Sequence, residues 1–552
     1  MGARPMMSSA SPQPAPSSPP SPSWKLAPAV AAQTQALVVT GFGDLPTGRA
    51  LFLEFRWPAD QSGTGWLAAL AQVAPITSAD PPGDTDPDTQ PQTAALAFTA
   101  AGLSRMKLPE TAAASFARAF REGMFQEDRL RRLGDRRLGA WQEGVIAGGP
   151  EWSGNTKLED LPPGPPGAFD VPHEHLTGDH VQTAVTVHAL LLLYARDDAA
   201  ANAWASQVEQ ALAPQGVAVV RTLDLLLDVL NLEKFSREHF GFADALSQPL
   251  PYDPAAVLVG GQPAVQHPVQ GVPLGDFLMG YMDGHHAVSP GPVVPPDAVP
   301  GGTPADAGLQ PSANAEGFFD LGLNGSYMVV RELKQYVAAF WQSMAANAAA
   351  IAQQDPDSAG IVTADWLAER VVGRDRDGHL LCPAGAKLAP LPDGTPDSNY
   401  GFFDTDPRGA GCPVGSHVRR AFPRDALAPT PDQKQTLLAA ANNHRILRRG
   451  RKFGPPATDP LVDDGADRGL LFMCLNTDID RQFEFVQQTW MLNPSFATLS
   501  DEVDPLVGPA GRMTIRDLPV RRTVQVDTFI KMAGGDYFFL PSLPALRYLA
   551  ML

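Results

Sequence analysis

The chain has 552 residues, of which 44% are hydrophobic and 18% charged, and carries a formal net charge of −18 with a pI near 5.0. These proportions are typical of a globular protein, whereas the acidic balance argues against nucleic acid or an anionic membrane as the main partner, because both attract clustered Lys and Arg. The three cysteines, Cys382, Cys412 and Cys474, include no CxxC pair. We therefore expect neither a disulfide framework nor a zinc or iron–sulfur site, and we infer a reducing compartment.

The amino-terminal segment is rich in Pro, Ser and Ala and shows neither a twin arginine nor a continuous apolar stretch of the kind that export signals contain. We expect residues 1–35 to form a disordered tail. The longest strongly apolar run, residues 187–195, is far shorter than the ~20 residues that a membrane helix needs. The sequence therefore predicts a cytoplasmic protein without a membrane span.

The first half of the chain alternates strand-like and helical segments. Strands are expected where β-branched and aromatic residues cluster, at residues 36–42, 50–57, 93–103 and 187–195. The last of these is continuous enough to be buried on both faces. Helices are expected where apolar residues recur at helical spacing, at residues 63–74 and over 104–145.

The second half of the chain also alternates strand-like and helical segments. Strands are expected at residues 325–333, 469–476 and 536–542, and helices at 334–354 and 478–490, which together predict an α+β fold. Between the elements lie Pro- and Gly-rich connections at 145–180, 249–317 and 385–435. These connections are longer than ordinary loops, so we expect them to form functional walls or to be partly disordered.

One histidine stands out by its surroundings. Residues 411–424, GCPVGSHVRRAFPR, place His417 directly before Arg419, Arg420 and Arg424. Neighbouring cations discourage an imidazole from taking up a proton, so its lone pair stays free. The pattern therefore suggests a ligand for a metal or a haem iron.

Five segments in order identify a family. They are GFADALSQP (241–249), GFFDLGLNGSYMVVREL (317–333), GCPVGSHVRRAFPRD (411–425), HRILRRGRKFG (444–454) and GLLFMCLNTDIDRQFEFVQQTW (469–490). From about residue 36 to the carboxyl terminus the chain resembles the dye-decolourising (DyP-type) haem peroxidases. The resemblance implies two ferredoxin-like α+β halves, which we place at residues 36–215 and 216–552, with a haem b in the second half. It also implies the hydrogen-peroxide-dependent oxidation of bulky phenols and dyes.

The resemblance further implies roles for single residues. His417 corresponds to the proximal iron ligand, Asp244 to the distal acid and Arg448 to the distal arginine. Cleavage of peroxide needs a base, an acid and a cation, which Asp244 and Arg448 can supply. The second ring nitrogen of an iron-bound histidine normally donates to a carboxylate or carbonyl, and Glu484 is our candidate for that partner.

One position departs from the family pattern. The family's GxxDG motif ends in glycine, whereas this chain has Ala245. Glycine at that position suggests a backbone angle that a side chain resists. Either the loop tolerates alanine or the distal pocket is reshaped, which would affect efficiency more than haem binding.

Several alternatives stay open. Arg449 rivals Arg448 as the distal arginine, and Asp244 could serve only to cap a turn. The protein could be a haem-binding carrier, a sensor or a part of a larger assembly with little turnover, and an oligomer is compatible with the sequence. Other conspicuous residues are interpreted as structural: the histidines at 173–175 and at 285–286, His444, and the core aromatics Phe340, Trp341, Phe483, Phe485 and Trp490.

Overall fold

A computed structural model describes residues 25–63, 65–80, 92–135, 151–155, 183–227, 236–255, 267–383, 397–517 and 520–552. Residues 1–24 of the expected tail and the histidines at 173–175 lie outside these ranges. The expectation of a disordered tail is wrong for its last part, because Pro28–Ala31 forms helix α1. After this helix in the chain, the buried Gln35 donates hydrogen bonds from Nε2 to the carbonyl oxygens of Leu96 (2.9 Å) and Pro541 (2.8 Å).

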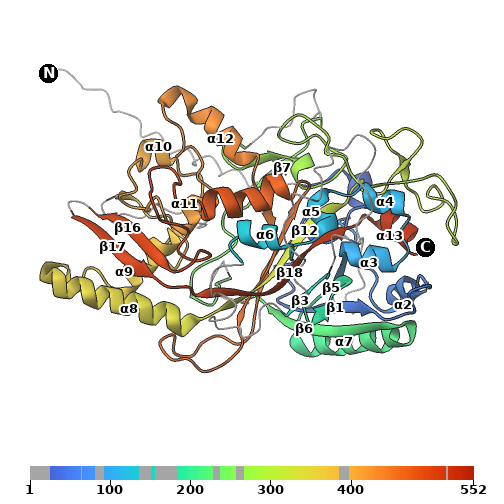
Figure 1. The fold of residues 1–552 in the computed structure, drawn as a ribbon, viewed down its shortest axis with the longest axis horizontal. Helices are drawn as coiled ribbons and strands as arrows, with labels where there is room; N and C mark the ends of the chain where they lie inside the picture. The colour runs from blue at the N-terminus through green and yellow to red at the C-terminus, as the bar shows by residue number, and fades with distance from the viewer. Residues whose placement is uncertain are drawn as a thin grey trace, which may run out of the picture.

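Four antiparallel strands form the first sheet in the order β6–β1–β5–β2. They are β1 (Thr47–Phe55), β2 (Thr93–Phe98), β5 (Ala189–Ala195) and β6 (Val217–Leu226). Helices α2 (Trp66–Val73) and α7 (Asp198–Leu212) pack against each other, and α7 also packs on β1 and β5. Figure 1 shows α7 running along this sheet. The strand order is that of a ferredoxin-like unit, and β6, which follows the expected boundary at residue 215, pairs with β1.

The second sheet repeats this order as β14–β15–β12–β18. Its strands are β12 (Ser326–Gln335), β14 (Arg451–Phe453), β15 (Gly469–Asn476) and β18 (Ile530–Leu540). The two sheets join at both edges, through β14 with β6 and β18 with β2, and become one 11-stranded sheet with β3 (Trp152–Ser153), β4 (Val185–Thr186) and β13 (Leu447–Arg448). The α+β prediction with two ferredoxin-like strand sets is therefore confirmed.

The inner faces of the joined sheets enclose one hydrophobic core. Because successive strand side chains point to opposite faces, alternate residues of both sheets meet there, among them Phe52, Leu192, Val330, Met473 and Phe538. The outer face of the second sheet is covered by loops and helices of the carboxyl-terminal half. The site described below lies on this face.

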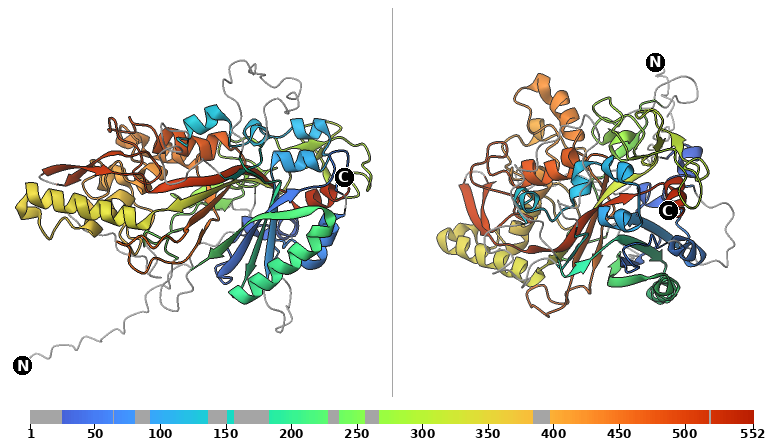
Figure 2. Two further views of the ribbon diagram at one scale, coloured as in Figure 1. Left: turned by 60° about the horizontal axis from the view of Figure 1, so that its bottom comes forward. Right: turned by 45° about the vertical axis from the view of Figure 1, so that its right-hand side comes forward.

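The remaining helices are short, with one exception. Between β2 and β3 lie α3 (Ala100–Arg105), α4 (Glu110–Ala114), α5 (Arg118–Glu122) and α6 (Glu127–Arg132). The carboxyl-terminal half adds α9 (Ala364–Val372), α10 (Phe402–Thr405), α11 (His417–Ala421), α12 (Lys434–Asn442) and α13 (Leu543–Leu549). The longest described helix, α8, covers Val337–Gln354. It lies with the hairpin of β16 (Gly511–Asp517) and β17 (Val520–Val526) at the end of the molecule opposite α7 (Figure 2).

Several expected elements differ from the structure. Residues 36–42 contain a buried 3₁₀ turn, Ala36–Val38, in place of a strand, because this apolar run packs into the inner core without a strand partner. Residues 104–135 form separate short helices, and 136–145 lie outside the described residues. The helix expected at 478–490 consists of two π-helical segments, Asp480–Glu484 and Val486–Met491.

Among the residues that the structure describes, no helix combines the length and the hydrophobicity that crossing a bilayer requires.

Candidate active site

A cavity of about 290 Å³ lies on the outer face of the second sheet. Its floor consists of outward side chains of the three longer strands, Arg331 and Leu333 on β12, Leu470 and Phe472 on β15, and Ile530 and Met532 on β18. The loop at 240–247, helix α11 and the second π-helical segment cover it. Most of the lining is apolar, and the polar groups come from a few elements that are distant in sequence.

His417 is the first residue of α11 and lines this cavity. Its Nδ1 donates to Asp504, at 3.0 Å from Oδ2 and 3.2 Å from Oδ1. Asp504 is fully buried and also accepts the backbone N–H groups of Leu506 and Val507, both at 2.9 Å, so its carboxylate is held in place. With Nδ1 bound to a carboxylate, Nε2 is the ring nitrogen that keeps a lone pair.

Two expectations about His417 are wrong. Burial lowers the pKa of His417, but the charge and the hydrogen bond of Asp504 together outweigh it and leave this pKa raised, not lowered. The neighbouring arginines turn away toward backbone carbonyls: Arg419 Nη1 donates to Cys412 O (3.0 Å), and Arg420 Nη1 and Nη2 donate to Trp490 O and Glu502 O (both 2.7 Å).

Glu484 is not the partner of His417. Its Oε1 accepts from Arg129 Nε and from the Tyr537 hydroxyl, both at 2.6 Å, and it does not line the cavity. The helix that carries Glu484 turns this side chain toward α6 and β18. Asp504 takes the expected role from a loop 87 residues beyond His417. No spacing or motif in the sequence marked this aspartate among the many acidic residues.

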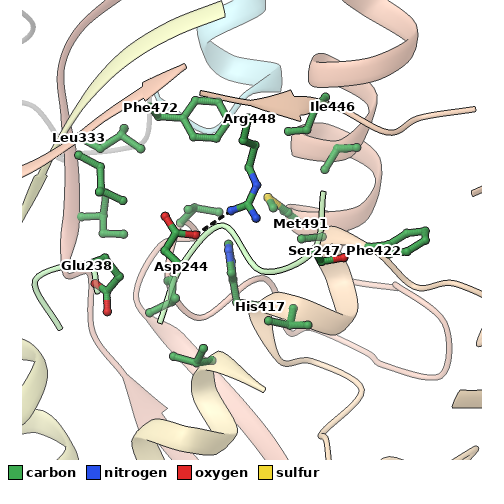
Figure 3. A pocket seen from close by; sticks show the side chains of 18 of the residues that line it. Glu238, Asp244, Ser247, Leu333, His417, Phe422, Ile446, Arg448, Phe472 and Met491 are labelled. Carbon is green, nitrogen blue, oxygen red and sulfur yellow. Dashed lines mark hydrogen bonds and ion pairs between the residues drawn. The ribbon is translucent and has the colours of Figure 1, made fainter. Parts of the chain in front are cut away.

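Asp244 and Arg448 form an ion pair at the cavity. Arg448 Nη1 lies 2.9 Å from Asp244 Oδ1, and both side chains are partly accessible, 32% and 39% exposed. Figure 3 shows the guanidinium of Arg448 and the ring of His417 pointing toward one another. The Oδ1 atom of Asp244 also accepts the N–H of Ala245 at 2.6 Å, so both Arg448 and the backbone hold this carboxylate at the cavity.

The structure separates Arg448 from its rival. Arg449 Nε and Nη2 donate to Leu37 O (2.8 Å) and Val38 O (2.7 Å), away from the cavity, and Arg449 does not line it. Consecutive side chains of an extended segment face opposite sides, which explains the difference. Ala245 has φ +61°, which confirms that this position takes a backbone angle that favours glycine.

Glu238 shapes the loop that carries Asp244. Its Oε2 accepts from Phe240 N (2.8 Å) and Gln335 Nε2 (2.6 Å), and its Oε1 accepts from Phe242 N (2.8 Å). Burial raises the pKa of Glu238 to about 7. No sequence pattern marked Glu238, although it lies six positions before Asp244 and lines the same cavity (Figure 3).

The cavity fits a haem group by the chemistry of its donors. Nε2 of His417 is available as an axial nitrogen, and the surrounding wall is largely apolar. Arg331, on the floor, is buried and ion-paired with Asp135, and its Nε and Nη1 atoms have no hydrogen-bond partner among the described residues. These two unpartnered nitrogen atoms can donate hydrogen bonds to a carboxylate of the kind that haem carries.

The other residues interpreted as structural have varied surroundings. Phe340 and Trp341 pack in a separate core around α8 and α9, whereas Phe483 lines the cavity. His444 also lines it, stacked 3.7 Å from Phe485 with Nδ1 2.6 Å from Arg481 O. His285 and His286 are exposed and, within the described ranges, belong to no group of converging metal-ligand atoms.

Comparison with known proteins places this site in a family. No protein-family model matches the chain. The chain is 30% identical over 391 residues to the multifunctional dye peroxidase DyP2 of Amycolatopsis sp., covering 66% of this chain and 71% of that protein. It is 26% identical over 355 residues to a dye-decolorizing peroxidase of Mycena epipterygia, covering 57% of each chain.

Solved structures share the fold. The DyP-type peroxidase of Anabaena sp. aligns with a TM-score of 0.63 and 22% identity over 94% of this chain and 95% of its own. A dye-decolorizing peroxidase in complex with 2,6-dimethoxyphenol aligns with a TM-score of 0.62 and 23% identity over 95% of this chain and 99% of its own. Because the Amycolatopsis relative is matched over more than two-thirds of its length, the chain belongs to the DyP-type dye-decolorizing peroxidases, a family of hydrogen-peroxide-dependent haem oxidoreductases.

Proposed function

We propose that this protein binds a haem b through His417 and uses Asp244 and Arg448 to reduce hydrogen peroxide while it oxidises bulky aromatic donors. One observation carries the proposal. Three residues that are far apart in sequence line a single cavity, one of them an imidazole held by a buried carboxylate and two of them a carboxylate–guanidinium pair.

His417 would hold the haem iron through Nε2. The hydrogen bond from Nδ1 to Asp504 fixes the ring orientation and makes Nε2 a more basic ligand. Arg331, with two unpartnered nitrogen atoms, is the candidate for holding a carboxylate of the group. When bound, the haem iron supplies the electrons that break the O–O bond and recovers them from the donors.

Asp244 moves the proton. Its Oδ1 atom is engaged by Arg448 and by the backbone, while no described residue hydrogen-bonds Oδ2. The carboxylate can therefore take the proton from one oxygen of hydrogen peroxide and deliver it to the other, which leaves as water. The Arg448 guanidinium stabilises the negative charge that develops on the leaving oxygen, and its position is set before the reaction by the ion pair.

The reducing donors are proposed to be dyes and phenols. The relatives are named as dye peroxidases, and one structural neighbour is a complex with 2,6-dimethoxyphenol. The cavity of about 290 Å³ would be taken up by the haem group, which leaves no room in it for a bulky donor. Such donors would therefore be oxidised at the edge of the haem or through side chains at the surface.

The test uses absorption spectra and stopped-flow kinetics of the haem-loaded protein. Asp244→Asn should keep the haem absorption band and slow the reaction with peroxide by about 10²- to 10⁴-fold, the range of a lost general acid–base group. His417→Ala should lose or shift the band. Asp253→Asn removes an aspartate that does not line the cavity and should behave like the unsubstituted protein.

Two results would contradict the proposal. An unchanged peroxide rate in Asp244→Asn would remove this residue from the mechanism. No spectral response of the unsubstituted protein to peroxide would instead favour a haem-binding carrier or sensor of the same fold.

A further inference from the structure

The cavity wall carries more positive charge than its acids can balance. Besides Arg331 and Arg448, it includes Arg374, Arg424 and Arg445, which are only 4%, 1% and 5% exposed. Among the described residues, none of these three has a carboxylate within ion-pair distance. Burying an uncompensated guanidinium is costly, so a cluster of three calls for a compensating group.

Their present partners are neutral. Arg374 Nη1 donates to Gly378 O at 2.5 Å, and Arg424 Nε and Nη2 donate to Ser398 O at 3.0 and 2.8 Å. Arg445 Nη1 donates to Gln270 Oε1 at 2.8 Å. Burial lowers the pKa of Arg424 to about 9 and that of Arg374 to about 10. Neutral oxygen atoms satisfy hydrogen bonds but leave the charge in place.

Arg445 has an unused donor that is fixed in position. Its guanidinium lies 3.9 Å from the centre of the Phe422 ring, and Gln482 Nε2 holds its backbone carbonyl at 2.8 Å. Its Nη2 atom is buried without a hydrogen-bond partner in the described structure. Because Nη1 and the ring fix the guanidinium, Nη2 cannot easily turn elsewhere to find a partner.

Ser247 supplies a second unused polar group. It follows Asp244 by three residues, lines the same cavity, and its Oγ is likewise buried without a partner in the part of the chain that the structure describes. Figure 3 shows Ser247 and Phe422 on the same side of the cavity. A hydroxyl and a guanidinium N–H are both donors to an anion, and unsatisfied buried donors call for a ligand.

We propose that Arg445 and Ser247 form a subsite for a small monovalent anion, beside the Asp244–Arg448 pair. The anion accepts hydrogen bonds from Nη2 of Arg445 and Oγ of Ser247 and balances the charge of Arg424 and Arg374. A halide or nitrate has the charge and the size for such a site. This inference concerns anion binding and holds whether or not the proposed peroxidase reaction occurs.

Because Arg448 belongs to the same group of charges, an anion in this subsite should also weaken the stabilisation that Arg448 gives to the negative charge developing on the leaving oxygen. Nitrate should slow the reaction with peroxide several-fold in stopped-flow measurements, at constant ionic strength set with a bulky organic sulfonate. This second readout links the subsite to the reaction.

The direct test is a crystal of the haem-loaded protein soaked in bromide, with diffraction recorded at the bromine absorption edge. An anomalous peak within hydrogen-bond distance of Arg445 Nη2 and Ser247 Oγ is expected. Arg445→Met should abolish the peak and the nitrate effect on the reaction with peroxide. Arg512→Met, which removes an exposed arginine that does not line the cavity, should retain both.

If Arg445→Met fails to fold, Ser247→Ala carries the test, because it removes one small neutral group, and it should weaken both effects. The inference is overturned if bromide occupies surface positions but not this one, or if a haem carboxylate is found on Arg445 Nη2. Failure of peroxide turnover with a bromide peak in place would overturn the proposed function and leave the subsite standing.

Discussion

At the scale of single residues, the loop that carries Asp244 is held by several hydrogen bonds and contains one residue with an unfavourable backbone angle. Glu238 accepts two backbone N–H groups of the loop and the side chain of Gln335, and Ala245 in the same loop has φ +61°. A left-handed alanine costs about 1 kcal/mol. Ala245→Gly should therefore raise the free energy of unfolding by about 0.5–1 kcal/mol and preserve the Asp244–Arg448 pair, as measured by denaturant unfolding. Ala243 has no positive φ, so Ala243→Gly should lower the free energy of unfolding. Equal decreases of this free energy in both variants would show that Ala245 is not strained.

Asp504 is the second residue whose role can be measured alone. Asp504→Asn keeps the shape of the side chain and its acceptor for Leu506 and Val507, but it weakens or reverses the bond with Nδ1 of His417. Loss of such a partner typically reduces metal affinity about 10- to 100-fold. A haem titration followed by absorbance should show this loss. Asp501→Asn, an exposed aspartate three residues earlier, is the control, and equal affinity in both variants would exclude Asp504 as the partner.

At the scale of elements, one buried arginine connects the two halves. Arg129 on α6 binds Glu484 on the π-helical segment (2.6 Å) and Glu122 on α5 (2.8 Å), with all three side chains buried. Arg129→Met leaves the two buried carboxylates with only the partly exposed Arg118 (2.5 Å from Glu122) and Arg132 (3.3 Å from Glu484), and should lower the free energy of unfolding by up to about 3–5 kcal/mol in urea. Arg131→Met, on the same helix but exposed, should change it by less than about 0.5 kcal/mol. Similar losses in both variants would show that helix propensity dominates.

The elements also show how far sequence patterns reach. Strand β15 begins and ends as predicted, since its apolar run is flanked by clear boundaries. Strand β18 begins at Ile530 and not at 536, because Gly534 and Gly535 continue the strand where the Trp152 ring and the Val330 carbonyl leave no room for a side chain. A pair of glycines in the sequence does not by itself indicate that a strand continues. Close approach depends on tertiary packing, which one sequence does not display.

The same limit applies to the site. The motif residues Asp244, Arg448 and His417 were found because each lies in a recognisable segment, and the structure brings all three to one cavity. Asp504 and Arg445 were missed or passed over because their roles depend on contacts across long chain separations. Local patterns identify groups that do chemistry more readily than the partners that hold or balance them.

At the scale of the whole molecule, acids with raised pKa values set an unusual dependence of stability on pH. Burial raises the pKa of Glu238 from 4.5 to about 7 and that of Asp276 from 3.8 to about 6, and desolvation together with the charge of Glu484 raises the pKa of Asp480 from 3.8 to about 7. Each acid binds more protons in the folded than in the unfolded state between these values. Its contribution to stability is therefore present below the unfolded pKa and is lost as pH rises through the folded pKa.

The free energy of unfolding should consequently fall between about pH 4.5 and pH 7, with a slope of at most about 1.4 kcal/mol per pH unit for each acid. Urea unfolding at a series of pH values measures this slope. The double variant Glu238→Gln, Asp276→Asn should make the slope shallower and leave the contribution of Asp480, whereas Asp501→Asn, an exposed control, should leave the slope unchanged. Below about pH 4 the trend reverses, because the charge of His417 holds the pKa of buried Asp504 below its usual value against the effect of burial, and that contribution is lost in acid. A slope that is the same in the double variant as in the unsubstituted protein would show that Glu238 and Asp276 are ionised in the folded protein.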